Sequence, residues 1–592
     1  MIEKCREHIG KYLLRFPFKE HLPAMTFIAF ALVIQAFLFF SGRIPLDQDD
    51  CYLGIQGLDI LKGSWPVLFP GQNYMGSLEA YFHVLFRLIL GGGTALTLKT
   101  QAAVQMLIFL FTFYLFAKRF FDRSIVLFAL LLFCVPPNFL AYWYGKIRGY
   151  MPPLILGNGI LYLLFRLDEK DSPGKPSHAF FLLGLLMGIA WWANPISIYY
   201  GAFIFLLSLL SSRLRASLWR DSFCSLGIVI NGFALLSLMI LEFRTLFDTK
   251  HIAFFNMLFH WRNIVWVGLI LFIIISFMIK IWKPKTGISL FLVCMGGILG
   301  SIPLILVYWN SEIYRLRQGP GNLYTFYHNI ILTPSFVFPI FAGLTNIITD
   351  TDSFLFPPGI IIIVAILYMG AIYYTLRTGF RSGRNHRNII LLGFTILILF
   401  WTQKIYVWYH SRFLLPFYIP LFIMMAFFFR ELNRVFKNLG TLLVSLLIVV
   451  HIWGIVGLPA NEIIKTSGLF PYEQKILDFC QRHRLKKVFI ILTDDQVGRL
   501  NYLADKKIIF HNPLGYSDRL LAYETRYQDL SVYNLIIHED TPLDSPPFSQ
   551  PNAEIEGFHI FLDLSREQFQ NLCSSISKAR NEKTKRIYEN VP

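Results

Sequence analysis

The chain has 592 residues, of which 55% are hydrophobic and only 15% are charged. Soluble domains carry about a quarter charged residues, so this composition excludes a simple soluble enzyme, a disordered protein and a disulfide-stapled secreted module. It is typical of a polytopic membrane protein. The formal net charge of +17 raises nucleic acid as a partner, and the positions of the basic residues decide that question.

Apolar stretches long enough to cross a bilayer, which takes about 17–25 residues, recur along the chain. Thirteen candidate spans lie at about 23–41, 96–117, 124–141, 151–165, 179–193, 197–212, 223–241, 262–280, 287–309, 356–376, 388–402, 413–429 and 439–457. The stretch 78–90 is also apolar, but it contains Glu79, His83 and Arg87. We therefore predict a helix along the membrane surface there, within a polytopic all-α membrane domain over 1–460.

Lys and Arg concentrate in alternate short loops between the predicted spans, from 118–123 to 430–437. Cytoplasmic loops carry such an excess, so the charge marks the inner membrane face and not a nucleic-acid groove. The pattern predicts a cytoplasmic N-terminus and an extracytoplasmic C-terminus, which requires an odd number of spans; thirteen fits, and eleven also would. No small-residue cleavage site follows the first apolar run, so we expect that run to be an uncleaved anchor.

Residues 461–592 differ in composition, because Lys, Arg, Asp and Glu become frequent. The stretches Lys487–Leu492 and Ser531–Ile537 are typical of buried strands, and Pro471–His483 is typical of an amphipathic helix. We predict a small extracytoplasmic α/β domain here. The chain contains no Asn-x-Ser/Thr sequon, which favours a bacterial inner membrane over a eukaryotic secretory pathway.

The first outward loop, at about 42–95, is unusually long and opens with a carboxylate cluster. Asp47, Asp49 and Asp50 lie within four residues at the membrane boundary. Carboxylates this close repel one another and need a cation, hydrogen-bond donors or solvent. They could form a catalytic group, but a solvated loop start or an aspartate that caps the next helix would also account for them.

The stretch 46–81 resembles the first extracytoplasmic loop of bacterial GT-C membrane glycosyltransferases, in the family 39-like branch of protein mannosyltransferases and aminoarabinose transferases. Asp49 and Asp50 occupy the carboxylate pair of that branch, with Asp in place of the usual Glu at position 50. The run Gly71–Ala80 (GQNYMGSLEA) matches the segment that follows. Shorter similarities come later in the same order, at Tyr144–Tyr150, Trp191–Pro195 and Arg412–Tyr418.

This resemblance implies an enzyme that moves a sugar from a polyprenyl-phosphate donor to an acceptor hydroxyl on the extracytoplasmic face. Asp49 would be the general base, with inversion at the sugar, and Asp50 would be the second carboxylate of the site. The acceptor could be a glycan, a lipid or a protein. No cofactor is expected, except that Asp47, Asp49 and Asp50 could hold a divalent cation through their oxygens.

Cations must neutralise the departing lipid phosphate, and arginine is the better planar partner for it. The candidates are outward cations near the membrane plane: Lys146, Arg148, Arg315, Arg317 (both in the late outward loop at 310–355) and Arg412. A cation at the end of a span can also simply extend to the lipid headgroups. For the acceptor pocket the candidates are Gln72, Tyr74 and Glu79, although Glu79 could instead cap the surface helix and Tyr74 could pack against lipid.

Two other classes of membrane protein would share a lipid-linked substrate. A transporter or flippase of lipid-linked sugars predicts charges within the spans and two similar halves, whereas here most charges lie at span ends and no two halves look alike. A polysaccharide polymerase or ligase places its long functional loop late in the chain, and this chain has one directly after the first span. The sequence favours the transferase and leaves both alternatives open.

Overall fold

The computed structural model describes residues 18–44, 46–69, 75–92, 94–169, 177–211, 295–297, 299–303, 323–345, 355–379, 381, 383–401, 408–458, 471–491, 500, 502–504, 508–511, 533–538, 553–555, 558–565, 567–568 and 571. The spans predicted at 223–241 and 262–280, and most of the one at 287–309, lie outside these residues. The number of thirteen spans therefore stays a prediction.

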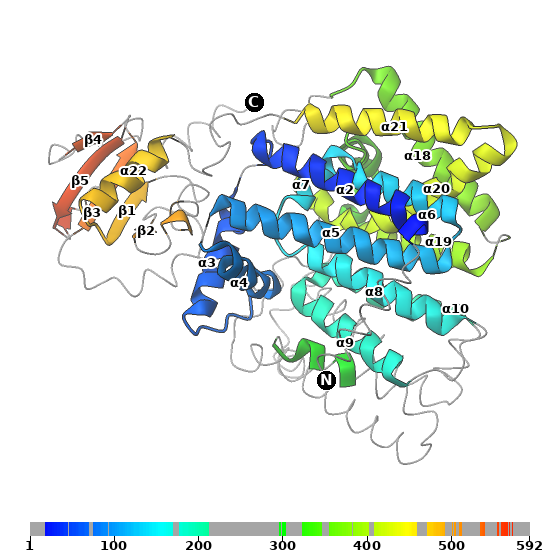
Figure 1. Cartoon of the computed structure of the whole chain (residues 1–592), viewed down its shortest axis with the longest axis horizontal. Coiled ribbons are helices and arrows are strands. Elements are labelled where there is room, and N and C mark those ends of the chain that lie inside the picture. Colours follow the sequence, from blue (N-terminus) through cyan, green and yellow to red (C-terminus); the bar gives the residue numbers. More distant parts are fainter. Residues whose placement is uncertain are drawn as a thin grey trace, which may run out of the picture.

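Within the described part of the chain, five helices are long and apolar enough to cross a membrane. They are α2 (Phe18–Phe40), α5 (Ala95–Phe120), α18 (Pro358–Gly379), α20 (Tyr418–Val435, extended to Ser411 by the 3₁₀ helix η3, Trp408–Phe417) and α21 (Leu439–Val456). All five lie over predicted spans. In Figure 1, the axes of α2, α5 and α21 are roughly aligned through the helical bundle.

The span predicted at 124–141 is broken. It consists of α6 (Arg123–Cys134) and α7 (Asn138–Tyr144), which meet at an angle of 74°. Pro136 and Pro137 lie between the two helices, and proline cannot continue the main-chain hydrogen bonds of a helix. The bend turns the chain after α7 toward the start of α5, where Lys99 donates a hydrogen bond to the main-chain oxygen of Gly145.

Four further predicted spans coincide with helices that are shorter or less apolar than the five above: α8 (Met151–Asp168), α9 (Ser177–Ala193), α10 (Ile198–Leu210, after the 3₁₀ turn η1, Pro195–Ser197) and α19 (Arg384–Trp401). The segment predicted as a loop at 310–355 is helical in its middle, with α16 (Leu323–Leu332), the π-helical turn η2 (Thr333–Val337) and α17 (Phe338–Phe341). Its aromatic and aliphatic side chains favour helix over loop, and Pro334 and Pro339 interrupt it.

The first loop folds into two helices, α3 (Gln48–Leu61) and α4 (Leu78–Leu90), which pack on each other. Helix α4 is too short to cross a bilayer, as predicted for the stretch 78–90. Its polar residues Glu79, His83 and Arg87 are buried, whereas Leu85 and Ile89 are 54% and 78% exposed. The helix therefore turns its polar face to the protein and its apolar face outward, which agrees with a position at the membrane surface.

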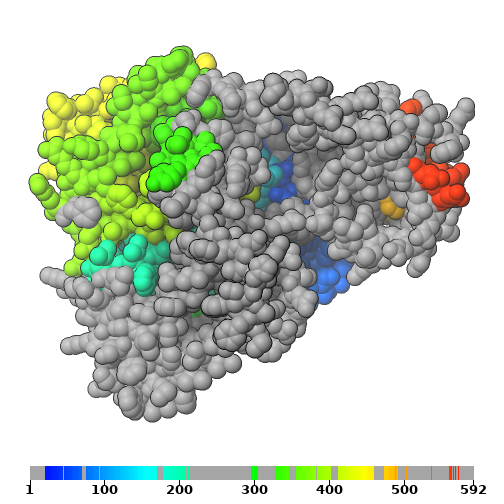
Figure 2. Space-filling view, turned by 180° about the vertical axis from the view of Figure 1, so that it is seen from behind, coloured from blue at the N-terminus to red at the C-terminus, as the bar shows by residue number. Residues whose placement is uncertain are grey.

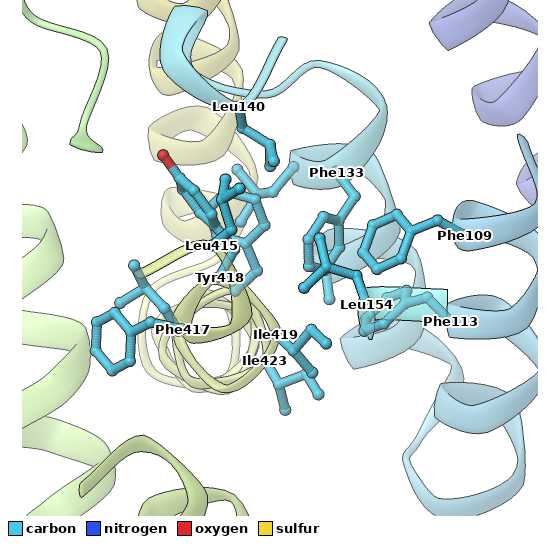
Figure 3. Packing of buried hydrophobic residues seen from close by; sticks show 14 of the residues in the cluster. Phe109, Phe113, Phe133, Leu140, Leu154, Leu415, Phe417, Tyr418, Ile419 and Ile423 are labelled. Carbon is cyan, nitrogen blue, oxygen red and sulfur yellow. The ribbon is translucent and has the colours of Figure 1, made fainter. Parts of the chain in front are cut away.

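An aromatic core joins the helices of the bundle. Phe113 of α5 lies 4.5 Å from Phe133 of α6, measured between ring centroids, and Phe133 lies 4.7 Å from Phe422 of α20. Figure 3 shows these α5 and α6 rings facing α20, whose Ile419 and Ile423 point toward them. Such tilted and edge-to-face ring contacts add to the burial of apolar area and fix the spacing of the helices.

The C-terminal part contains a five-stranded mixed sheet in the order β2-β1-β3-β5-β4. The strands are β1 (Lys487–Ile491), β2 (Ile509–His511), β3 (Tyr533–His538), β4 (Ala553–Ile555) and β5 (Phe558–Leu564). Strand β1 pairs in parallel with β2 and β3, and β5 is antiparallel to β3 and β4. The helix and two strands predicted from the sequence are present as α22 (Pro471–Arg482), β1 and β3.

The sheet lies at the end of the molecule where α3 and α4 emerge from the bundle (Figure 1). From behind, the green and yellow residues of about 360–450 and the red residues of β5 occupy opposite ends of the molecule (Figure 2). Helices α3 and α4 thus stand between the helical bundle and the sheet, and the carboxylate cluster is at the start of α3.

Candidate active site

The carboxylate cluster forms the first turn of α3. Asp47 is the N-cap: its side chain accepts a hydrogen bond of 3.0 Å from the main-chain N–H of Asp50, and the Asp50 carboxylate accepts one of 3.4 Å from the N–H of Asp47. This reciprocal capping box satisfies N–H groups that a helix start leaves without partners. The capping role considered for these aspartates is therefore confirmed for Asp47, and Asp49 is left as the residue of the cluster outside the box.

The loop after α7 supplies two cations to this turn. Lys146 is fully buried, and its ammonium donates to Asp47 Oδ2 at 2.6 Å and to Asp50 Oδ2 at 3.2 Å. Arg148 makes a two-pronged contact with Asp47, with its Nε 3.1 Å from Oδ1 and its Nη2 against Oδ2. Charge-assisted, two-pronged hydrogen bonds of this kind are the strong ones, so the loop and the start of α3 form one unit.

A third cation was not predicted from the sequence. Lys99, near the start of α5, is buried; its ammonium donates to the main-chain oxygen of Gly145 at 2.9 Å and lies 3.8 Å from Asp50 Oδ2. Asp50 also accepts a hydrogen bond of 3.0 Å from the N–H of Ile147, and its side chain is 1% exposed. The signal was a single lysine within an expected span, and charged residues at such positions are usually paired or functional.

The three aspartates therefore differ in accessibility. The side chain of Asp50 is closed in among Lys146, Lys99 and the main chain, and that of Asp47 is 11% exposed and engaged by two cations. The side chain of Asp49 is 19% exposed, and Arg148 is 3.9 Å from its Oδ2. Asp49 is the carboxylate of this turn that an incoming group can reach most easily.

Arg412 joins the same region from far along the chain. Its guanidinium carbon lies 5.9 Å from the centre of the Trp143 ring and 5.4 Å from that of Tyr150. Arg148 lies 5.7 Å from the same Trp143 ring. The two arginines thus share one indole, which contributes cation–π attraction to both. The structure brings together Asp49, Lys146, Arg148 and Arg412 from the set of residues predicted from the sequence.

Glu79 has a different place from the one predicted. Its side chain is buried, and its Oε2 accepts a hydrogen bond from the N–H of Gly149. Gly149 has a φ of +75°, in the left-handed region that favours glycine. Glu79 does not cap α4, whose N-cap is Ser77. It lines no open surface and instead holds the loop that carries Lys146 and Arg148.

Burial raises the pKa of Glu79 from 4.5 to about 8, because a buried carboxylate loses its hydration. The N–H of Gly149 and the side chain of Gln105 oppose this shift, and the negative charge of Asp50 adds to it. Glu79 is therefore mainly protonated at neutral pH, beside a cluster whose charges are already paired.

Glu79→Gln is expected to change how stability depends on pH. Between the unfolded pKa of about 4.5 and the folded pKa of about 8, the folded protein binds more protons than the unfolded chain, so the free energy of unfolding falls as the pH rises through this window. Glutamine does not titrate, so the variant does not show this fall in the free energy of unfolding. The melting temperature of the variant in detergent, relative to the wild type, should rise from acid to alkaline pH. A difference in melting temperature that does not change with pH would contradict a protonated Glu79. The matched control is Glu169→Gln, because Glu169 is paired with Arg119 at the surface.

Four predicted site residues, Gln72, Tyr74, Arg315 and Arg317, lie outside the described residues. Among the residues that the structure does describe, no group of three His, Cys, Asp or Glu side chains could hold a metal ion. The oxygens of Asp47 and Asp50 are directed at Lys146, Arg148 and Lys99. These aspartates do not fit the predicted divalent cation, because protein cations already take that position.

No protein-family model matches the sequence, and no curated protein does either. The structure is similar to that of ArnT from Cupriavidus metallidurans bound to undecaprenyl phosphate, over 92% of this chain and 98% of that one, with 12% sequence identity and a TM-score of 0.51. A weaker similarity, with a TM-score of 0.46 and 12% identity, covers 89% of this chain and 70% of the oligosaccharyltransferase AglB from Archaeoglobus fulgidus, in complex with an inhibitory peptide and a dolichol-phosphate.

The likeness to ArnT defines the class of fold. The chain has a GT-C-like fold, as the motif of its first loop predicted. With five helices in its described residues that are long and apolar enough to cross a bilayer, it is an integral membrane protein.

Proposed function

We propose that the protein is a membrane glycosyltransferase that moves a sugar from a polyprenyl-phosphate donor to an acceptor hydroxyl. The observation that carries the proposal is a reachable carboxylate beside Arg148, which shares an indole ring with a second arginine, in a fold of the GT-C kind. The carboxylate of Asp49 is 3.9 Å from Arg148, and Arg148 shares the Trp143 ring with Arg412. The ArnT structure of this fold contains undecaprenyl phosphate, which supports the class of donor.

The reaction needs one base and a site for an anion. The acceptor oxygen attacks the anomeric carbon of the sugar while the bond from that carbon to the phosphate oxygen breaks, and the configuration inverts. Asp49 takes the proton of the acceptor hydroxyl. The electrons of the broken bond stay on the polyprenyl phosphate, which Arg148 and Arg412 stabilise as it leaves.

Asp50 has a supporting role in this scheme and not a chemical one. Its side chain is 1% exposed and paired with Lys146 and Lys99, so it cannot reach a substrate. Its charge keeps Lys146 in place, and Lys146 in turn keeps Asp47 and the helix start in place. We further propose that the site faces the extracytoplasmic side of a bacterial inner membrane, because the basic loops mark the opposite face.

The proposal is tested with purified protein in lipid nanodiscs and polyprenyl-phosphate sugars labelled in the sugar. We expect labelled sugar to move to an acceptor from a panel of lipid A, glycans and hydroxyl-bearing peptides, with equal release of polyprenyl phosphate. Movement of the same donors across the bilayer is measured with the protein in sealed vesicles. Movement of intact donor across the bilayer without any cleavage of the sugar–phosphate bond would contradict the transferase and support a flippase.

A further inference from the structure

Among the residues that the structure describes, Tyr502 connects the C-terminal sheet to the helices of the candidate site. The side chain of Tyr502 is 1% exposed, yet it does not belong to the core of its own sheet. It is part of the apolar cluster of the first loop, with Cys51, Tyr52 and Leu53 of α3. Cys51, the first member of this cluster on α3, directly follows Asp50.

The segment that carries Tyr502 has two faces. Leu500, Ala504 and Ile508 belong to the core of the sheet, together with residues of α22, β1, β3 and β5. Leu503 packs against both that core and the cluster of the first loop. The described residues of this segment are thus fixed to the sheet on one side and place the ring of Tyr502 among α3, α4 and α5 on the other.

Helix α3 has a glycine where the ring of Tyr502 lies against it. A Cβ atom at Gly54 would be 2.3 Å from Cε2 of Tyr502, which is far closer than side chains approach. Gly54 is four residues after Asp50, so the two positions lie on the same face of the helix, one turn apart. The ring therefore packs against the turn of α3 that follows the turn with Asp49 and Asp50.

The hydroxyl of Tyr502 is also fixed. Its single proton has two acceptors within reach, the main-chain oxygen of Thr94 at 3.1 Å and Nε2 of His83 at 3.3 Å. The other ring nitrogen of His83 is 2.9 Å from Oε1 of Gln101, which can only accept, so Nδ1 carries the proton and Nε2 is an acceptor toward Tyr502. Burial lowers the pKa of His83 to about 4, so the ring is neutral at physiological pH.

We propose that Tyr502 is a positioning residue, through which the C-terminal sheet holds the first turn of α3, and with it Asp49, in the orientation needed for sugar transfer. This inference rests on the proposed function and assigns the C-terminal part a role in the reaction itself. Tyr502 touches no reacting atom in this scheme. It acts through α3, by filling the space that Gly54 leaves and by tying α4 and the start of α5 to the same point.

The test compares Tyr502→Ala with Tyr502→Phe in the full chain, in nanodiscs. Displacing a catalytic group by about 1 Å can cost about 10²-fold in rate, so we expect kcat of Tyr502→Ala to fall by that order while KM for the donor stays near the wild-type value, because Arg148 and Arg412 are unchanged. Tyr502→Phe keeps the ring and should keep most of kcat. Amide hydrogen exchange in α3 should rise in Tyr502→Ala and stay unchanged in α20 and α21.

Gly54→Ala tests the same contact from the other side, in case Tyr502→Ala fails to fold. The added methyl group displaces the ring and should reproduce the loss of kcat and the faster exchange in α3. In the double variant that combines Gly54→Ala with Tyr502→Ala, the added methyl group enters the space left by the ring. The losses of kcat in the two single variants should therefore not add. A well-folded Tyr502→Ala or Gly54→Ala protein with wild-type kcat and wild-type exchange in α3 would overturn the proposal.

Experiment can distinguish a failure of the proposed function from a failure of the positioning role of Tyr502. If the wild-type chain transfers no sugar from any polyprenyl-phosphate donor, the proposed function is wrong, and the exchange of α3 amides still decides whether Tyr502 holds this helix. If the wild type is active and both variants are as active and as rigid as it is, only the positioning role is wrong.

Discussion

Asp49→Asn is expected to lower the rate of sugar transfer by a factor of about 10²–10⁴, which is what general-base assistance typically contributes. Asparagine has the same shape but cannot take the proton of the acceptor hydroxyl. Binding of the donor should remain, because Arg148 and Arg412, the arginines proposed to stabilise the phosphate, are untouched. The measurement is single-turnover transfer, together with binding of polyprenyl phosphate to the same protein preparation.

Asp59→Asn, near the other end of α3, is the matched control, and its transfer rate should stay close to that of the wild type. An aspartate in the first turn also stabilises the helix through the helix dipole, by about 0.3–1 kcal/mol, so the melting temperature of Asp49→Asn is measured in parallel. A folded Asp49→Asn protein with near wild-type transfer would show that another group takes the proton.

Lys146→Met is expected to have the largest effect on stability. The ammonium of Lys146 is fully buried and is shared by Asp47 and Asp50, at 2.6 and 3.2 Å. Removal of one partner from a buried ion pair typically costs about 3–5 kcal/mol, because it leaves buried charge without compensation. Arg148 and Lys99 remain, so we expect the lower end of that range, seen as a marked fall in the melting temperature and a loss of transfer.

The double variant Lys146→Met with Asp50→Asn separates charge from packing. If uncompensated charge is the cause, neutralising Asp50 should restore part of the stability that Lys146→Met loses, while the hydrogen bond from the N–H of Ile147 is kept by the asparagine oxygen. Lys62→Met, an exposed lysine just after α3, should change little. A double variant less stable than Lys146→Met would argue against the charge explanation.

The sequence predicts the parts of this molecule that depend on local patterns. The five long apolar helices, the surface helix α4, and the strands β1 and β3 follow from the length and composition of single stretches. Strand β5, Phe558–Leu564, was not predicted although, apart from Phe561, it alternates apolar and polar residues. The order of the strands comes from pairing between distant segments, which no local pattern encodes.

The candidate site also has residues that local motifs predict and contacts that they do not. The first-loop motif leads to Asp49 and Asp50, and the later similarities lead to Arg148 and Arg412. The sequence cannot tell that Asp50 is closed off and Asp49 reachable, because that difference is made by Lys99 and Lys146 from other elements. It also cannot show that Glu79 supports a loop, or that Tyr502 enters the first-loop cluster, since both contacts join segments far apart in the chain.

The outward apolar face of α4 has a consequence for the depth of the reaction centre. We expect a helix that exposes Leu85 and Ile89 at 54% and 78% to lie at the boundary between acyl chains and headgroups, and α3 packs on it. Acyl-chain length and hydrophobic mismatch therefore act on the height of α3 above the hydrocarbon. The lipid chosen for reconstitution therefore influences the geometry of the proposed site.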